Sequence, residues 1–202
     1  MSTDTRTLDD TRELGRSAGP AGRPPRAPAI RHHDTIPPGE TVARELGSPL
    51  GTLLLIGDGV RLRHLELPSS KRPLAIDPAW RRSGTAYPDV AEQLERYFAG
   101  EQREFSLELD LVGTSFQRRV WTLLASIKFG STWTYGELAR RMGNPAASRA
   151  VGAANGRNPI PIILPCHRVI GSDGSLVGFG GGLDAKRRLL ELEASASQPG
   201  LF

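Results

Sequence analysis

The spacing of apolar residues changes near residue 111, and this change constrains the fold more than any other feature of the chain. In residues 105–111 (FSLELDL) every second residue is apolar, which is typical of a half-buried β-strand. In residues 115–127 (SFQRRVWTLLASI) the apolar residues recur every three or four positions, which predicts an amphipathic helix. We therefore expect two differently built parts, a small α/β domain over residues 36–110 and a mainly helical domain over residues 111–202.

The first of these parts carries two further elements with clear signals. Apolar segments at 50–56 and 60–67 flank Gly57-Asp58-Gly59, which predicts a β-hairpin and places the start of regular structure near residue 47. Residues 88–100 place their apolar side chains on one helical face, with a proline at the start and a glycine just past the end. No residue pattern in this domain indicates chemistry.

The N-terminal segment differs in composition from the rest. Glycine and proline crowd residues 18–29 (AGPAGRPPRAPA), and the segment lacks the apolar spacing needed to offset the entropy of ordering it. We expect residues 1–35 to be a disordered tail, with the adjacent His32 and His33 solvated rather than bound to metal.

Two short helices are predicted next to each other in the second domain. Thr134 and Glu137 form a capping box that opens a helix through residue 142. Asn144 and Pro145 supply the cap and first residue of a second helix, which reaches Ala154, so the pair has the outline of a helix-turn-helix. The second helix is made almost entirely of small residues, which fits either close helix packing or a narrow surface such as the DNA minor groove.

Charge and cysteine content narrow the class of protein. Residues 1–110 hold 15 Lys and Arg against 17 Asp and Glu, whereas residues 111–202 hold 11 against 5, so the second domain is suited to an anionic partner. The single cysteine permits no internal disulfide and no CxxC pair for zinc. No apolar run is long enough to span a membrane, and the polar N-terminus has no secretory pattern, so we expect a cytoplasmic protein.

That cysteine, Cys166, is the candidate reactive group. It follows a short apolar run at 160–164, from which we expect a buried strand that ends at the cysteine. A lone cysteine is usually an inert buried side chain, but here His167 and Arg168 adjoin it, and a nearby cation favours the nucleophilic thiolate. A glycine-rich loop at 178–182 and a helix carrying Glu193 follow, and a carboxylate that orients a histidine beside a cysteine is the usual arrangement of an activated nucleophile.

Residues 149–171 (RAVGAANGRNPIPIILPCHRVIG) and 178–190 (GFGGGLDAKRRLL) closely resemble the signature of the O6-alkylguanine-DNA alkyltransferase family. The resemblance runs without a gap from about residue 113 to residue 193, and more loosely over the first domain. It implies a ribonuclease-H-like N-terminal domain and a C-terminal winged helix-turn-helix domain. It also implies double-stranded DNA as partner, approached through the minor groove, no cofactor and no metal. A monomer is expected, and cooperative binding along DNA is left open.

The resemblance also assigns roles to individual residues. It makes Cys166 the alkyl acceptor, with His167 acting through a water and Glu193 supporting that histidine. Tyr135 would meet the flipped guanine and help to protonate it, while Arg149 would fill the gap in the base stack. The remaining residues are expected at the base or the DNA: Asn158 bracing the turn, the backbones of Cys166, Val169 and Gly180 bonding the base, the Phe179 ring packing on it, and Ser148 on the groove-facing helix.

Three positions depart from the family pattern. Ser115 replaces a common proline, which should matter little. Phe179 and Gly180 stand where a tyrosine and a serine or alanine often occur, so the range of alkyl groups accepted is left open. Some relatives bind zinc through N-terminal cysteines, and this sequence has none there.

The function implied is irreversible, single-turnover transfer of an O6-alkyl group, chiefly methyl, from guanine to Cys166, with O4 of thymine as a second substrate. Such a displacement needs a soft thiolate, a protonated leaving group and an extruded base. Two alternatives predict other behaviour: a Cys-His hydrolase or acyl transferase would turn over repeatedly without DNA, and a purely DNA-binding relative would lack the acceptor cysteine. A role like that of the adaptive-response activators would require a cysteine-rich zinc domain.

Overall fold

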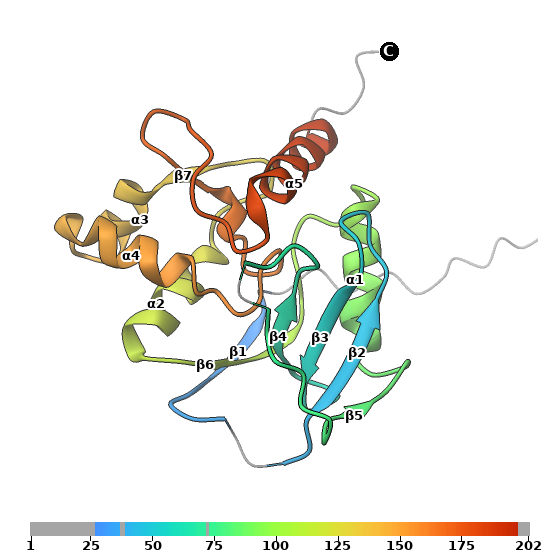
Figure 1. Ribbon diagram of the computed structural model, residues 1–202. Coiled ribbons are helices and arrows are strands. Elements are labelled where there is room, and N and C mark those ends of the chain that lie inside the picture. The colour runs from blue at the N-terminus through green and yellow to red at the C-terminus, as the bar shows by residue number, and fades with distance from the viewer. Residues whose placement is uncertain (1–26, 37–38, 72, 198–202) are drawn as a thin grey trace, which may run out of the picture.

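The computed structural model describes residues 27–36, 39–71 and 73–197, and it divides into a sheet-containing part and a helical part (Figure 1). Six strands form one sheet in the order β1-β6-β4-β3-β2-β5. The strands span β1 Ala29–His33, β2 Val42–Leu46, β3 Leu53–Gly57, β4 Leu62–Glu66, β5 Arg81–Arg82 and β6 Glu108–Val112. β2, β3 and β4 are antiparallel neighbours, whereas β6 runs parallel to both β1 and β4.

The predicted hairpin and the predicted helix of the first part are both confirmed. β3 and β4 pair across the turn at residues 58–61, with a register shift at Ile56/Gly57. Helix α1 (Pro88–Phe98) buries Val90, Leu94 and Tyr97 in the core that it shares with the sheet. Figure 1 shows α1 lying along the sheet near β2 and β3.

Three expectations about this part are wrong. Regular structure begins before residue 47, because β2 starts at Val42. The expected disordered tail does not extend to residue 35, because residues 29–33 form β1, whose five residues all pair with β6. Its His33 is not solvated as expected, since its Nε2 lies 3.2 Å from Oδ1 of the buried Asp110. Hydrogen bonding to a strand almost eighty residues away offsets the entropy of ordering this segment, which its own sequence does not. Residues 1–26 of the expected tail lie outside the described part of the chain.

The helical part begins with α2 (Ser115–Leu124), which is capped by a reciprocal bond pair between Thr114 and Gln117. The predicted capping box at Thr134 and Glu137 is present and opens α3 (Tyr135–Arg141). After Asn144, which caps as predicted, the chain makes a 3-10 turn η1 (Pro145–Ala147) before α4 (Ser148–Asn155), so the predicted second helix has a tighter first turn. The remaining elements are β7 Trp133–Thr134, η2 Cys166–Arg168, β8 Val169–Ile170 and α5 Gly182–Ser197.

The buried strand predicted at 160–164 is absent. Those residues form turns, and Cys166 opens the 3-10 helix η2 instead of ending a strand. Ile160, Ile162 and Leu164 are fully buried as predicted, but Ile162 has φ 74°, in the left-handed region that a strand does not use. Burial of an apolar run is thus compatible with a turn when the run lies inside the core.

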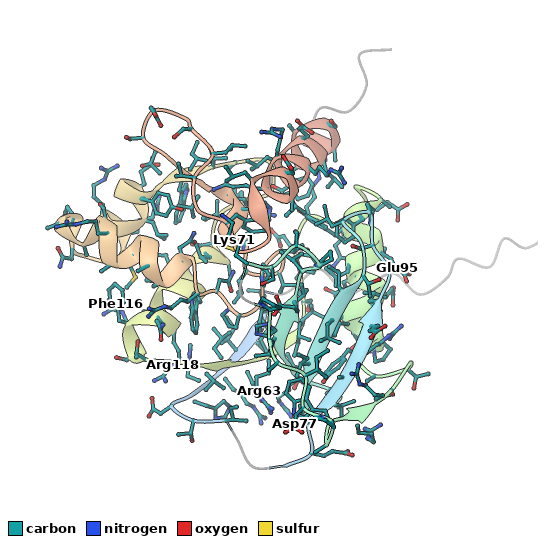
Figure 2. All side chains as sticks on the ribbon, in the orientation of Figure 1. Arg63, Lys71, Asp77, Glu95, Phe116 and Arg118 are labelled. Carbon is teal, nitrogen blue, oxygen red and sulfur yellow. The ribbon has the colours of Figure 1, made fainter. Side chains whose placement is uncertain are left out.

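Direct contacts join the two parts around the turn before Cys166 and the glycine-rich loop. The backbone N–H of Leu65 in β4 donates to the carbonyl of Pro159 over 2.9 Å. After β4 the chain crosses to that loop, where the N–H of Lys71 donates to the Gly180 carbonyl over 3.0 Å and the Ser69 hydroxyl donates to the Gly181 carbonyl. Figure 2 shows Lys71 at this junction between the sheet and α5.

Candidate active site

Cys166 lies at the start of η2, beneath the turn formed by residues 158–165, and only 4% of its surface is exposed. Asn158 braces that turn, since its Nδ2 donates to the Leu164 carbonyl over 2.6 Å and its Oδ1 accepts from the Ile160 N–H over 3.0 Å. The backbone N–H of Cys166 itself donates to the Leu164 carbonyl over 2.7 Å. The sulfur is therefore held by a turn whose shape is fixed from within.

Burial raises the pKa of the Cys166 thiol to about 11, and two neighbouring side chains oppose that rise. The first is the side-chain amide of Asn158 and the second is the positive charge of Lys186. Burial likewise lowers the pKa of Lys186 to about 8, while a negative charge on Cys166 favours its protonated form. The thiolate form of Cys166 and the protonated form of Lys186 therefore stabilise each other.

The expectation that Arg168 is the cation near the thiol is wrong. The guanidinium of Arg168 is occupied elsewhere, because Nε and Nη2 donate to Glu193 over 2.9–3.1 Å and Nη1 donates to the Ile127 carbonyl over 2.5 Å. Lys186 takes that place, with its Nζ on the carbonyls of Val169 and Val177 over 2.5 and 2.7 Å. The spacing of residues in α5 could have indicated this lysine, because Lys186 lies on the same buried face of the helix as Leu189 and Glu193.

His167 is completely buried, and its Nε2 lies 2.8 Å from Oε1 of Glu193. Burial lowers the pKa of His167 despite that carboxylate, so the ring is neutral at pH 7. Burial alone would raise the pKa of Glu193, but bonds from His167 and Arg168 outweigh it and hold the pKa at about 2. The ionised carboxylate accepts a hydrogen bond from the Nε2–H of the neutral ring, so the proton of the imidazole stays on Nε2 and Nδ1 is the unprotonated nitrogen.

This Nδ1 is buried and has no hydrogen-bond partner within the described residues. A buried ring nitrogen with a free lone pair is ready to accept a proton, directly or through a water molecule. The Phe179 ring packs against the imidazole of His167 in an edge-to-face arrangement, with 6.3 Å between the ring centroids. Phe179 is itself buried at this position.

Sequence reasoning missed Tyr97, which reaches the site from the first domain. Its ring belongs to the predicted apolar face of α1, but its hydroxyl donates to Oε1 of Glu193 over 2.7 Å. The Gly130 N–H donates to the other oxygen of Glu193 over 3.1 Å. Nothing in the sequence distinguishes this tyrosine from a core residue, because its partner is 96 residues away.

Tyr135 begins α3 and stands near the thiol, since a charge on Cys166 raises the pKa of its phenol further after burial has done so. The hydroxyl makes only long contacts with the carbonyls of Val177 and Gly178, at 3.4 and 3.5 Å. The remaining predicted residues differ in their exposure. Arg149 and Gly180 are exposed, Ser148 is half-buried at the start of α4 with its hydroxyl 3.4 Å from the Pro145 carbonyl, and Val169 is buried beside Lys186.

The described segments hold no group of three His, Cys, Asp or Glu side chains placed to bind a metal ion. Among the helices of those segments, none is both long and apolar enough to cross a membrane.

The fold and the site together define a two-domain protein in which a helix-turn-helix part carries a buried cysteine beside a histidine–glutamate pair. Two family profiles match it: the ribonuclease-like domain of 6-O-methylguanine DNA methyltransferase over residues 44–111, and the DNA-binding domain of the same family over residues 115–195. The chain belongs to the 6-O-methylguanine DNA methyltransferase family, and the fold class expected from the resemblance is confirmed.

Relatives and solved structures agree with this placement. The methylated-DNA–protein-cysteine methyltransferase of Mycobacterium leprae is 50% identical over 151 residues, which cover 74% of this chain and 90% of the relative. That of Methanosarcina acetivorans is 48% identical over 148 residues, covering 73% and 95%. A crystal structure of Mycobacterium tuberculosis OGT in complex with DNA superposes with a TM-score of 0.72 at 49% identity, covering 77% of this chain and 94% of that one.

Proposed function

We propose that this protein repairs duplex DNA by transferring the O6-methyl group of guanine to the sulfur of Cys166, irreversibly and once per molecule. The observation that carries this proposal is the buried thiol of Cys166 followed directly in the chain by His167, whose Nδ1 is buried and unpaired and whose Nε2 is held by Glu193. Family membership supplies the substrate class, since the relatives are methylated-DNA–protein-cysteine methyltransferases. O4 of thymine is a second proposed site of attack.

The chemical step requires a balanced movement of protons. His167 takes the thiol proton at Nδ1 through a water, and Lys186 stabilises the resulting thiolate. The sulfur then attacks the methyl carbon, an S–C bond forms, the C–O6 bond breaks, and the electron pair passes into the guanine. Tyr135 donates its hydroxyl proton to the departing base, a contribution typical of general acids at about 10²–10⁴-fold in rate.

The base must leave the stack for this attack, because a methyl group inside a duplex cannot reach a buried sulfur. We propose that α4 lies in the minor groove, where its exposed Ala150 and Ala153 permit close approach, and Ser148 contacts the adjacent backbone. Arg149, exposed on the same helix, enters the gap left by the base. Val169, Phe179 and Gly180 border the pocket that receives the guanine.

We further propose that the protein acts as a monomer in the cytoplasm. All of the groups placed around Cys166 come from one chain, so the site needs no second copy. A thiol that must stay reduced until it meets damage is suited to a reducing compartment. No cofactor or metal enters the step, since the displacement consumes only the thiol.

The decisive experiment is to mix the protein with duplex DNA carrying one O6-methylguanine and to measure the mass of the intact protein. One methyl increment located on Cys166, with no more than one transfer per molecule under excess DNA, is the expected result. The matched control is Cys166→Ala, which should bind the damaged duplex but gain no methyl group. Demethylated DNA with an unmodified protein would point to a hydrolase, and bound but unrepaired DNA would point to a lesion sensor.

A further inference from the structure

Asn155, the last residue of α4, carries a side-chain amide whose nitrogen and oxygen have no hydrogen-bond partner within the described segments. The residue is only 2% exposed. Leaving a buried polar group unpaired costs about 1–3 kcal/mol, so native proteins pair most of them. An apolar side chain would serve the core better at this position. The amide therefore needs an explanation other than stability.

The position of Asn155 places it beside Tyr135. Gly152 lies one turn earlier on the same face of α4, and a Cβ built there would be 3.6 Å from the Tyr135 ring. The Asn155 amide is close enough to the phenol oxygen to lower the pKa of Tyr135, against the rise caused by burial, although it makes no complete hydrogen bond to it. The same phenol feels the charge of Cys166.

The hydroxyl of Tyr135 makes no short hydrogen bond within the described residues. Its two contacts, to the Val177 and Gly178 carbonyls, are at 3.4 and 3.5 Å, beyond ordinary O–H···O lengths of about 2.5–3.0 Å. Both contacts use the hydroxyl as a donor. While the hydroxyl donates to these carbonyls, its proton is not available to a base.

We propose that Asn155 is a positioning residue for alkyl transfer, whose side-chain N–H donates to the Tyr135 oxygen once a base is bound and so directs the hydroxyl proton at that base. The inference rests on the acid role proposed for Tyr135. An N–H donor stabilises the phenolate more than the phenol, so the same bond makes Tyr135 a stronger acid. The amide is unpaired in this structure because its approach to the Tyr135 oxygen falls short of a hydrogen bond, and the proposed bond is completed when Tyr135 turns from the loop to the base.

The test uses Asn155→Leu, which keeps the size of the side chain and removes the amide. Single-turnover transfer is measured on duplex O6-methylguanine DNA and on free O6-benzylguanine, in the wild-type and in the Tyr135→Phe background. The loss expected in the wild-type background is about tenfold on both substrates, the value of one hydrogen bond near 1.4 kcal/mol. In the Tyr135→Phe background the same substitution should change the rate less than about twofold.

Thermal unfolding separates this role from a structural one. Removing an unpaired buried amide should leave the melting temperature of Asn155→Leu equal to or above that of the wild type, while transfer slows. A rate loss accompanied by a lower melting temperature would assign Asn155 to the fold and overturn the proposal. Asn155→Ala serves for the same cycle if the leucine variant does not fold.

The two failures are distinguishable. An unchanged rate for Tyr135→Phe alone would remove the acid role and the present inference with it. A slow Tyr135→Phe combined with an unaffected Asn155→Leu would overturn only the inference. Equal losses from Asn155→Leu in both backgrounds would show that the amide contacts the base itself.

Discussion

Glu193 shows how one residue organises the site. It is fully buried, and its carboxylate accepts hydrogen bonds from Tyr97, His167, Arg168 and the Gly130 backbone. These donors offset the cost of burying a charge, which would otherwise neutralise the group. The result is a permanently ionised carboxylate that fixes both the tautomer and the orientation of His167.

Tyr97→Phe removes one of these donors while keeping the ring. We expect a loss of about 1.5–3 kcal/mol in unfolding free energy, typical of a hydrogen bond to a charged group, together with slower transfer. Chemical denaturation and single-turnover kinetics measure the two effects. Tyr87→Phe is the matched control, since Tyr87 is a buried tyrosine bonded to the Val42 carbonyl, away from Cys166. It should lose stability without slowing transfer, and equal slowing by both variants would contradict the role of Tyr97.

At the scale of elements, α4 and the loop at 178–182 present different surfaces to a substrate. α4 exposes one long side chain, Arg149, among small ones, whereas the loop is tied to the first domain by bonds from Ser69 and Lys71. We therefore expect transfer from DNA to depend on both surfaces, and transfer from a free base to depend on the loop but not on α4.

Arg149→Ala should slow repair of duplex DNA even at saturating DNA, because its side chain offsets part of the few kcal/mol needed to extrude a base. Reaction with free O6-benzylguanine should stay near normal, since no stack has to be opened. Single-turnover rates on the two substrates provide the comparison. A duplex loss that disappears at saturating DNA would mean that Arg149 only binds phosphate, a contact that salt weakens.

Neighbouring glycines in the loop offer a matched pair. A Cβ at Gly181 would lie 2.4 Å from Leu67 Cδ1 and 3.1 Å from Phe179 Cε1, whereas a Cβ at Gly180 meets nothing within 4 Å. Gly181→Ala should therefore displace the loop and cost about 1–3 kcal/mol, with slower transfer from free O6-benzylguanine. Gly180→Ala should be tolerated in both assays. If the two variants behaved alike, the crowding at Leu67 would be irrelevant to the site.

At the scale of the whole molecule, Glu193 joins both domains, since the partners of its carboxylate come from α1, the turn at residue 130 and η2. Its pKa in the folded protein is about 2, below the ordinary 4.5, so the fold favours the ionised form. The corresponding stability is complete above about pH 4.5 and is lost as the pH falls toward 2, as for any carboxyl whose pKa is depressed by folding.

Acid unfolding tests this linkage. Glu193→Gln should be less stable than the wild type at pH 7 by on the order of 3 kcal/mol, and the gap should close as the pH falls from about 4.5 to 2. Glu191→Gln, at an exposed position on the same helix, is the control and should show no comparable gap. Denaturant titrations at several pH values measure the difference in unfolding free energy between each variant and the wild type. A gap independent of pH would mean that the charge of Glu193 contributes nothing to holding the domains together.

The sequence by itself determined the local elements and the reactive group. Periodicity placed the hairpin and α1, side-chain chemistry placed the caps at Thr134 and Asn144, and the run around Cys166 identified the family. These features depend on neighbours within a few residues, which a sequence displays directly. The site residues expected from the resemblance stay predictions about function, although the structure does bring His167 and Glu193 together.

Tertiary structure alone decided what depends on distant partners. β1 is a strand because β6 pairs with it, and residues 160–164 form turns because they are buried without a strand to pair with. Lys186 rather than Arg168 faces the thiol, because Glu193 and the Ile127 carbonyl hold the arginine away. Tyr97 joins the site and Asn155 lies unpaired beside Tyr135 for the same physical reason. The partner of a buried side chain depends on which remote segments pack and hydrogen-bond together, and the local sequence pattern does not contain that information.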